Sequence, residues 1–244
     1  LLDHPNIRLL TEHNVEEAAY DSESRQWRVR TPHGTLSGSH IVFCTGAGSL
    51  HAPITRQFSL QIIRGQTSIA PATEDSRALK TALSAASYIS PAWQGRHCFG
   101  ATFAPNNPDT AWQAEDERHN RQALSQLNEP LYHSLSAAWG DESSLHPTER
   151  GHAALRCDSP DHLPIVGALG DIAAMQTAYA KLALDKNYRL DNVPCPYLPN
   201  AYINTAHGTR GLATAPVCAA AIAADILGLP QPLSQRLRTA LHPN

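Results

Sequence analysis

The feature that most constrains the fold is a strand, a glycine-bracketed turn and a helix that follow one another in the segment NAYINTAHGTRGLATAPVCAAAIAADILGLP. The sequence predicts a strand over 201–205 and a helix that begins near Thr214 and stops at Gly228. Pro216 then falls in the first helical turn and Gly228 just past the last, which is the usual asymmetry of helix ends. The helix interior is mostly alanine, so we expect this helix to pack closely against a neighbour and to be buried.

The turn between this strand and this helix, His207-Gly208-Thr209-Arg210-Gly211, is a candidate binding element. A helix N-terminus presents free backbone N–H groups and about half a positive charge. The two glycines let a planar or anionic group approach the backbone closely. The turn can therefore hold a phosphate or the anionic edge of a reduced flavin. The alternative is a tight turn that binds nothing.

A second strand is expected at His40–Cys44, where a continuous apolar run ends in Thr45-Gly46-Ala47-Gly48. Such a run is typical of a strand that is buried on both faces of a parallel sheet. Ligands of open α/β sheets lie at the carboxyl ends of the strands, so this turn is a second candidate. The alternative is a buried strand that ends in small residues.

The segments between these two strands have the pattern of an antiparallel structure. Strands are expected in short runs over 6–47, at 61–70, in a hairpin over 87–103 that turns at Gln94-Gly95-Arg96, and at 151–159, with helices over 109–138 and 173–186. This order predicts an α/β fold with α+β character. Residues 1–57 and 150–244 would form part of a Rossmann-like nucleotide-binding domain, and residues 58–149 a mostly antiparallel substrate domain that interrupts it.

The segment LRCDSPDHLPIVG carries an arginine, Arg156, at the end of an apolar strand. Burying a guanidinium is costly unless it meets an anion, and its planar fork suits a carboxylate. Arg156 is therefore a candidate for binding a substrate carboxylate. The alternative is a structural pair with Asp158 or Asp161.

Composition excludes several classes of function. Five cysteines at no regular spacing predict a reduced, cytoplasmic chain, with Cys44 as the one candidate for reactivity. The 13 histidines have no ligand spacing, so no metal is expected, and no apolar run is long enough for a membrane span. A net charge of -3 predicts no broad nucleic-acid surface. The GxGxxG, Walker A, HExxH and GxSxG patterns are absent from this sequence.

Taken in order, the segments HIVFCTGAGS, IIRGQTS, SYISPAWQGRHCFGATF, LRCDSPDHLPIVG and HGTRGLATAPVCA resemble the D-amino-acid oxidase and glycine oxidase superfamily of flavoproteins. The resemblance is closer to the C-terminal, flavin-dependent half of bacterial bifunctional enzymes that make 5-methylaminomethyl-2-thiouridine in tRNA. The family's opening GxGxxG segment, which holds the ADP half of FAD, is not in this sequence, and the first residue is Leu. The resemblance therefore implies a truncated flavin domain from a longer protein, whose other half is a methyltransferase that uses S-adenosyl-L-methionine.

The resemblance implies FAD as the cofactor and assigns residues to it by position. These are Val15, Thr45, Gly46, Ala47, His207, Gly208, Thr209, Arg210, Gly211 and Leu212. It also implies the reaction: oxidation of the carboxymethylaminomethyl group on wobble uridine 34 of tRNA, with hydride passing to the flavin. Hydrolysis of the resulting imine then releases glyoxylate and leaves an aminomethyl group.

By the same resemblance Arg156 binds the substrate carboxylate, with Asp161, Pro164 and Gly167 matching its neighbours in the family's pattern. Arg64 is the reserve candidate for this role, and Tyr88 is expected to line the pocket.

Two other functions are left open. One is a free-standing oxidase of small amino acids such as glycine or sarcosine. The other is a catalytically inert fragment that acts as a binding or scaffolding module.

Overall fold

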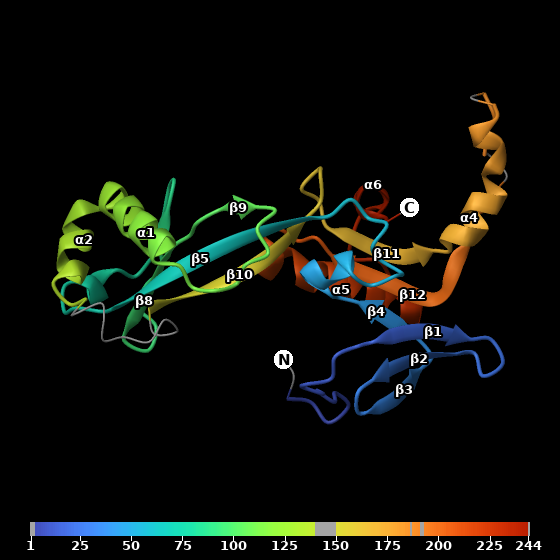
Figure 1. Cartoon of the computed structure of the whole chain (residues 1–244), viewed down its shortest axis with the longest axis horizontal. Coiled ribbons are helices and arrows are strands. Elements are labelled where there is room, and N and C mark those ends of the chain that lie inside the picture. The colour runs from blue at the N-terminus through green and yellow to red at the C-terminus, as the bar shows by residue number, and fades with distance from the viewer. Residues whose placement is uncertain (1–2, 140–149, 186, 191–192, 244) are drawn as a thin grey trace. The chain divides into compact units, whose positions relative to one another are not determined.

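The computed structural model describes residues 3–139, 150–185, 187–190 and 193–243. The chain divides into two compact units, and each is described by itself. Unit 1 comprises residues 1–45, 164–205 and 210–244, and unit 2 comprises residues 46–163 and 206–209. Figure 1 shows the labelled elements of both.

Unit 2 is built on a six-stranded antiparallel sheet in the order β10-β5-β8-β7-β6, with β9 also paired to β5. Its strands are β5 (Gln61–Pro71), β6 (Leu83–Ser84), β7 (Tyr88–Ile89), β8 (Arg96–Gly100), β9 (Ala104–Pro105) and β10 (Gly151–Asp158). The predicted hairpin over 87–103 is confirmed as β7 and β8, which turn at Gln94 and Gly95.

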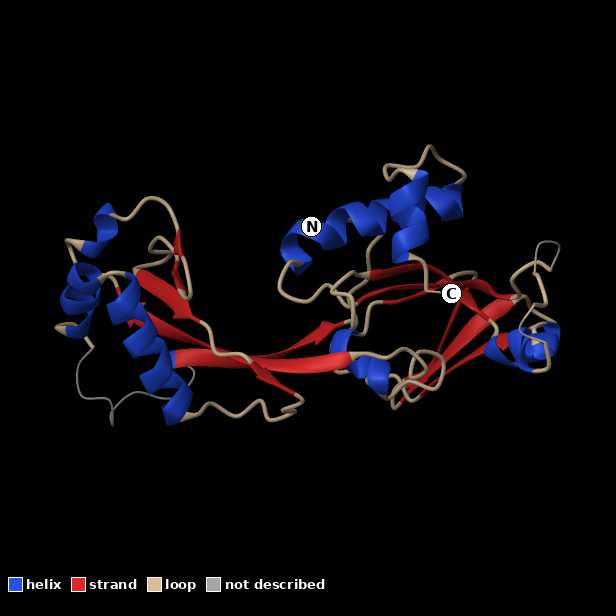
Figure 2. Ribbon diagram, turned by 90° about the horizontal axis from the view of Figure 1, so that it is seen from above, coloured by secondary structure: helices blue, strands red, loops and turns tan. Residues whose placement is uncertain are grey.

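Two helices cover one face of this sheet, α1 (Ala114–Leu127) and α2 (Glu129–Ser136), as Figure 2 shows. The predicted helix over 109–138 therefore begins later and is broken at Asn128. Asn128 is extended, and its side chain accepts a hydrogen bond from the N–H of Leu131, so it caps α2. The apolar core between the helices and the sheet is Ala70, Ile89, Phe99, Leu124, Leu135 and Trp139.

The described residues of unit 1 form two three-stranded sheets and three helices. The first sheet, β1-β2-β3, is a meander of β1 (Glu17–Asp21), β2 (Gln26–Thr31) and β3 (Gly34–Gly38). The second, β11-β12-β4, joins β11 (Ile165–Gly170), β12 (Tyr197–Thr205) and β4 (Ile41–Phe43). The helices of unit 1 are α4 (Ile172–Ala178), α5 (Gly211–Leu227) and α6 (Gln235–Leu241), and the 3₁₀ turn η4 (Ala180–Ala183) follows α4. Unit 2 also contains two 3₁₀ turns, η1 (Gly46–Leu50) and η2 (Ser76–Ala78).

The parallel pairing expected at residues 40–44 is confirmed, because β4 pairs with β12 in parallel. The expectation that this strand is buried on both faces is wrong. Within the described residues β4 is an edge strand of its sheet, and Val42 is 40% exposed.

The helix that follows the glycine-bracketed turn differs from the prediction at its start. Helix α5 begins at Gly211, not near Thr214, so Pro216 lies inside the helix, past its first turn. Its C-terminus is as predicted: Gly228 has a φ of 65°, and its N–H donates to the carbonyl of Ala224. Only one side of the helix is buried, along Cys218, Ala221, Ile222 and Ala224, so the expectation of a buried helix holds for that side alone.

Two other expectations change. Residues 6–10 form no strand, and the predicted helix over 173–186 is the short α4 followed by η4, with residue 186 outside the described part. Unit 2 includes β10, because β10 pairs with β5 along its whole length and so belongs to the antiparallel sheet. The predicted division into a nucleotide-binding part (1–57 and 150–244) and a substrate domain (58–149) stays a prediction.

Candidate functional site

The two faces of the unit 2 sheet separate the two arginines that the sequence singled out. Arg156 stands opposite Ile63 in the β10–β5 register, and side chains alternate between faces along a strand. Arg156 therefore shares a face with Gly65, Thr67, Cys98 and Tyr88. Arg64 points to the opposite face, which α1 and α2 cover.

The Arg156 guanidinium lies directly over Gly65. A Cβ atom on residue 65 would be 2.5 Å from Nη2 and 2.6 Å from Nη1 of Arg156, so any residue other than glycine would displace the guanidinium from this position. Within the described residues Arg156 has no ion pair, and its Nη1 is buried without a hydrogen-bond partner. The alternative of a structural pair with Asp158 or Asp161 is wrong, because Asp158 pairs with His162 and Asp161 accepts a hydrogen bond from Ser159. Nη1 of Arg156 is therefore able to bind an anionic group such as a carboxylate.

Tyr88 lies near this guanidinium, on the same face. Burial raises the pKa of the Tyr88 phenol, and the positive charge of Arg156 offsets only part of that effect. The phenol is therefore protonated and neutral at neutral pH, where it can donate a hydrogen bond but cannot act as a base. Cys98, on the same face, also has its pKa raised by burial, so its thiol is not a nucleophile there.

Arg64 has a structural environment. Its side chain is 1% exposed and forms an ion pair with Asp116 of α1. Nη2 donates to Oε1 of Gln66 at 3.1 Å and to the carbonyl of Ala111 at 2.7 Å. These contacts hold the start of α1 against β5. Arg64 is therefore not brought together with Arg156, and we do not propose it as a substrate ligand.

The first half of the glycine-bracketed turn lies at the end of β10. Gly208 has a φ of 54°, and its N–H donates to the carbonyl of Cys157 at 2.9 Å. His207 bridges to Asp158, whose carboxylate would lie 3.1 Å from a Cβ on residue 208. The turn thus meets β10 two residues beyond Arg156, or about 7 Å along the strand.

Asp158 is buried and is itself held in place. Its carboxylate accepts hydrogen bonds from the N–H of Ser159 at 3.0 Å and from Nδ1 of His162 at 2.7 Å. Burial lowers the pKa of His207, so this imidazole is neutral at neutral pH. Positive character at the turn must therefore come from the backbone and not from His207.

The second half of the turn leads into α5. Arg210 is the residue before the helix and makes no side-chain cap, so the first N–H groups of α5 are not capped in this way. Leu212 is fully exposed, at 101%. An uncapped helix N-terminus that begins at a glycine and is followed by an exposed leucine suits an anionic aromatic ring system. The first residues of α5 therefore fit the isoalloxazine end of FAD.

The other predicted cofactor residues occupy separate elements. Val15 precedes β1 and is 56% exposed. Thr45 follows β4, and Gly46, with a φ of 50°, and Ala47 form the start of η1. Their cofactor roles stay predictions. Partial burial raises the pKa of the Cys44 thiol, which argues against reactivity there.

Sequence reasoning missed Gly65 and the contact between Asp158 and the turn at 207–208. A glycine inside the strand pattern QIIRGQTSIA was the available signal for Gly65, because strand glycines often mark a close approach of another group. Asp158 gave no such signal, since its role depends on the fold of the turn at 207–209.

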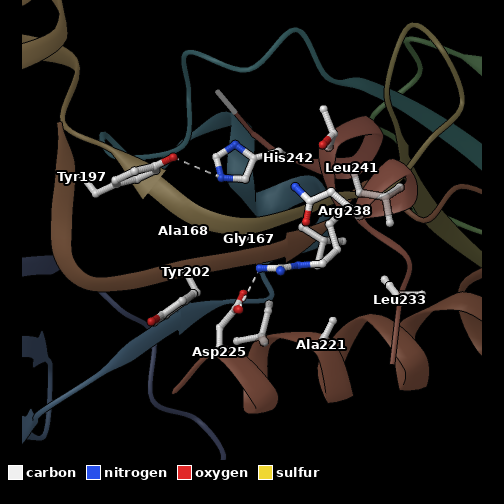
Figure 3. Close-up of a pocket in the computed structure, with 14 residues that line it drawn as sticks. Gly167, Ala168, Tyr197, Tyr202, Ala221, Asp225, Leu233, Arg238, Leu241 and His242 are labelled. Carbon is white, nitrogen blue, oxygen red and sulfur yellow. Dashed lines mark hydrogen bonds and ion pairs between the residues drawn. The ribbon is translucent and has the colours of Figure 1, made fainter. Parts of the chain in front are cut away.

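A separate pocket of about 440 Å³ lies in unit 1, between the β11–β12 sheet and helices α5 and α6. Figure 3 shows Arg238 directed at Asp225, which it meets at 2.8 Å, and Tyr197 directed at His242, at 3.5 Å. None of the predicted site residues lines this pocket. Among the described residues no cluster of His, Cys, Asp and Glu is able to hold a metal ion. None of the described helices has the length and apolar character needed to cross a membrane.

One prediction tests the packing of Arg156 over Gly65. Changing Gly65 to alanine in the full-length protein should push the guanidinium from its place and cost about 1 to 3 kcal/mol of substrate binding, or about 5- to 150-fold in KM. Gly38→Ala is the matched control, because its Cβ would be at an ordinary 3.4 Å from the carbonyl of His40. Steady-state kinetics with both variants measure the effect on KM. An unchanged KM in Gly65→Ala would rule out a substrate site at the Arg156 guanidinium above Gly65.

Comparison with known proteins gives a consistent family. Residues 4–225 match the family described as "FAD dependent oxidoreductase", DAO. Two similar relatives bear the name "tRNA 5-methylaminomethyl-2-thiouridine biosynthesis bifunctional protein MnmC". That of Pseudomonas entomophila is 37% identical over 244 residues, which are 100% of this chain and 36% of the relative. That of Chromobacterium violaceum is 37% identical over 245 residues, with the same coverage.

Solved structures share the fold at low sequence identity. Glycine oxidase from Geobacillus kaustophilus superposes with a TM-score of 0.70 at 16% identity, over 98% of this chain and 53% of that one. Iminodiacetate oxidase from Chelativorans superposes with a TM-score of 0.61 at 14% identity, over 91% and 51%. The chain thus spans about a third of the length of the curated relatives and about half of these structures.

Proposed function

The chain belongs to the FAD dependent oxidoreductase family, DAO, and from this premise we propose that it carries the amine-oxidising step of a tRNA modification within a longer protein. The substrate is the carboxymethylaminomethyl group on wobble uridine 34, and the products are glyoxylate and the aminomethyl uridine. The names of the relatives that match the whole chain support tRNA as the substrate and a fused methyltransferase half as the neighbouring domain.

The observation that carries the proposal is the unpartnered Nη1 of Arg156 above Gly65. The substrate side chain is a secondary amine that ends in a carboxylate. A planar guanidinium binds a carboxylate through two parallel hydrogen bonds, so it fixes both the position and the orientation of the glycyl carbon. Tyr88, neutral on the same face, can donate a further hydrogen bond.

The chemistry needs an electron acceptor and little acid–base help. FAD, when bound, would supply the acceptor for a hydride from the glycyl α-carbon of the neutral amine. The remaining C=N bond adds water, and cleavage of the C–N bond releases glyoxylate and leaves the primary amine on the uridine. The N-terminus of α5, which no side chain caps, can stabilise negative charge through its N–H groups. Tyr88 is protonated and cannot act as a base, and its lowered pKa makes His207 a weak base, which agrees with a mechanism without a strong general base.

Two experiments separate this proposal from its alternatives. Full-length protein should release glyoxylate from tRNA that carries the carboxymethylaminomethyl group, and release none at comparable concentrations of free glycine or sarcosine. A glycine or sarcosine oxidase would show the reverse preference. A scaffolding module would show neither activity and no flavin absorbance after purification.

A second prediction concerns the turn. Gly208→Ala should destabilise the protein by about 1 to 2 kcal/mol, because alanine is strained at a φ of 54°, and should release FAD more readily. A Cβ on residue 208 would also lie only 3.1 Å from the Asp158 carboxylate. Gly228→Ala is the control, since φ is 65° there but nothing lies within 4 Å. The midpoint of thermal unfolding should fall by a similar amount in both variants, because the backbone strain is similar. Flavin fluorescence should show flavin release at a lower temperature only in Gly208→Ala. Equal flavin retention in the two would place FAD away from this turn.

A further inference from the structure

Trp93 is the one exposed tryptophan in a chain that otherwise shields this residue type. Its side chain is 78% exposed, whereas Trp27 and Trp139 are 2% and 8% exposed and Trp112 is half-buried. A tryptophan left in water forgoes the burial that makes it valuable in a core. Tryptophan and arginine are the side chains most enriched among the residues that dominate binding energy at interfaces.

The hairpin between β7 and β8 presents this side chain on a rigid turn. The N–H of Trp93 donates to the carbonyl of Arg96 at 2.8 Å, and the N–H of Arg96 donates back at 3.0 Å. Gln94 and Gly95, with φ of 49° and 77°, complete a two-residue turn that suits a twisted hairpin. Trp93 therefore needs no ordering of its backbone when it meets a partner.

The base of the hairpin is fixed to the rest of unit 2. His97 is fully buried, with Nδ1 against the carbonyl of Ser90 at 2.8 Å and Nε2 against Oγ of Ser76 at 2.9 Å. The N–H of Ala72 donates to the carbonyl of Gly95 at 2.8 Å. These contacts place the η2 segment beside the hairpin.

Cationic side chains accompany the exposed ring. Arg96 is exposed on the hairpin itself, and Arg77 and Lys80 are exposed on and just after η2. Glu74 and Asp75 are exposed in the same segment, so the surface is mixed and not broadly basic. An aromatic face with an adjacent guanidinium is the combination that stacks on an unpaired base and contacts its phosphate.

This surface is too far from Arg156 for a small substrate to touch both. Arg156 stands opposite Ile63 and Arg96 opposite Pro71 on the same strand, β5. At about 3.4 Å per residue the two arginines lie about 27 Å apart along the sheet. A glycine-sized molecule cannot span this distance, whereas a folded RNA can.

We propose that the tip of the β7–β8 hairpin, Trp93 with Arg96, is a contact for the tRNA at a distance from the reacting uridine. This inference rests on the proposed function. Trp93 stacks on an unpaired base, and Arg96 contacts the phosphate backbone next to it. The contact adds binding energy for tRNA that free amino acids and single nucleosides cannot obtain.

The test compares two substrates in full-length protein: tRNA that carries the carboxymethylaminomethyl uridine, and the isolated modified nucleoside. Trp93→Ala is expected to raise the KM for tRNA about 5- to 100-fold relative to the KM for the nucleoside. Trp93→Phe, which keeps an aromatic face, should recover most of the loss. Leu184→Ala, at a leucine 88% exposed in unit 1, is the matched control and should leave both KM values as they are.

A binding measurement gives a readout apart from activity. Arg96→Ala should weaken tRNA binding and reduce the slope of log K against log salt by about 1, as expected for one lost phosphate contact. Wild-type tRNA affinity in both Trp93→Ala and Arg96→Ala would overturn the hairpin contact and leave the proposed function standing, provided that wild-type protein releases glyoxylate from tRNA. If wild-type protein releases none, the proposed function fails and this inference fails with it.

Discussion

Arg156→Ala in the full-length protein is expected to raise the KM for carboxymethylaminomethyl tRNA by about 30- to 700-fold, or about 2 to 4 kcal/mol. The guanidinium has a buried nitrogen without a partner and no ion pair among the described residues, so its charge is available to a substrate carboxylate. Arg156→Lys should recover only part of the loss, because an ammonium cannot form the two parallel hydrogen bonds of the planar fork.

The same variant should fold normally. Removing Arg156 breaks no ion pair within the described residues, so the midpoint of thermal unfolding should stay close to that of the wild type. Steady-state kinetics and a melting curve on one preparation therefore separate loss of binding from loss of structure. A KM that stays at the wild-type value in a folded Arg156→Ala protein would remove this residue from the site.

Arg64→Ala is expected to have the opposite profile, with a loss of about 3 to 5 kcal/mol in the free energy of unfolding. The change strips Asp116 of its buried partner and leaves a space between β5 and the start of α1. For a protein of this size the midpoint of thermal unfolding should fall by about 6 to 20 °C. Arg30→Ala is the control, because its pairs with Glu16 and Glu17 are more than half exposed at the arginine and should contribute less than about 1 kcal/mol.

The effects of Arg156→Ala and Arg64→Ala on KM and on thermal unfolding together decide which arginine binds the substrate. If Arg64→Ala melted like the wild type but lost substrate binding, Arg64 would regain the role that we assign to Arg156. If both variants only destabilised the protein, the sheet would carry no carboxylate site at either position.

Elements with a strong local pattern were predictable from the sequence. The helix end at Gly228, the hairpin at Gln94-Gly95 and the strand at Ile41–Phe43 each follow from residues within a few positions. The start of α5 was not, because Pro216 suggested a first turn that the structure places three residues earlier. The placement of β10 in the antiparallel sheet could not be predicted either, since β10 and β5 are distant in the sequence.

Some residues of the candidate site were likewise indicated by the sequence, and others became apparent only in the structure. An arginine in an apolar strand pointed to Arg156, and glycines around a turn pointed to Gly208. The strand QIIRGQTSIA could not show which of its faces a helix would cover, so Arg64 stayed a candidate until Asp116 was seen to hold it. Gly65 became meaningful only when the guanidinium was seen to lie over it.

The most direct test is to add carboxymethylaminomethyl tRNA without oxygen to full-length, FAD-loaded protein and record the flavin absorbance together with glyoxylate. We predict that the oxidised flavin band bleaches and that one glyoxylate appears for each flavin reduced, whereas Arg156→Ala requires far more tRNA for the same bleaching. A flavin that tRNA leaves oxidised while free glycine bleaches it would contradict the proposed function.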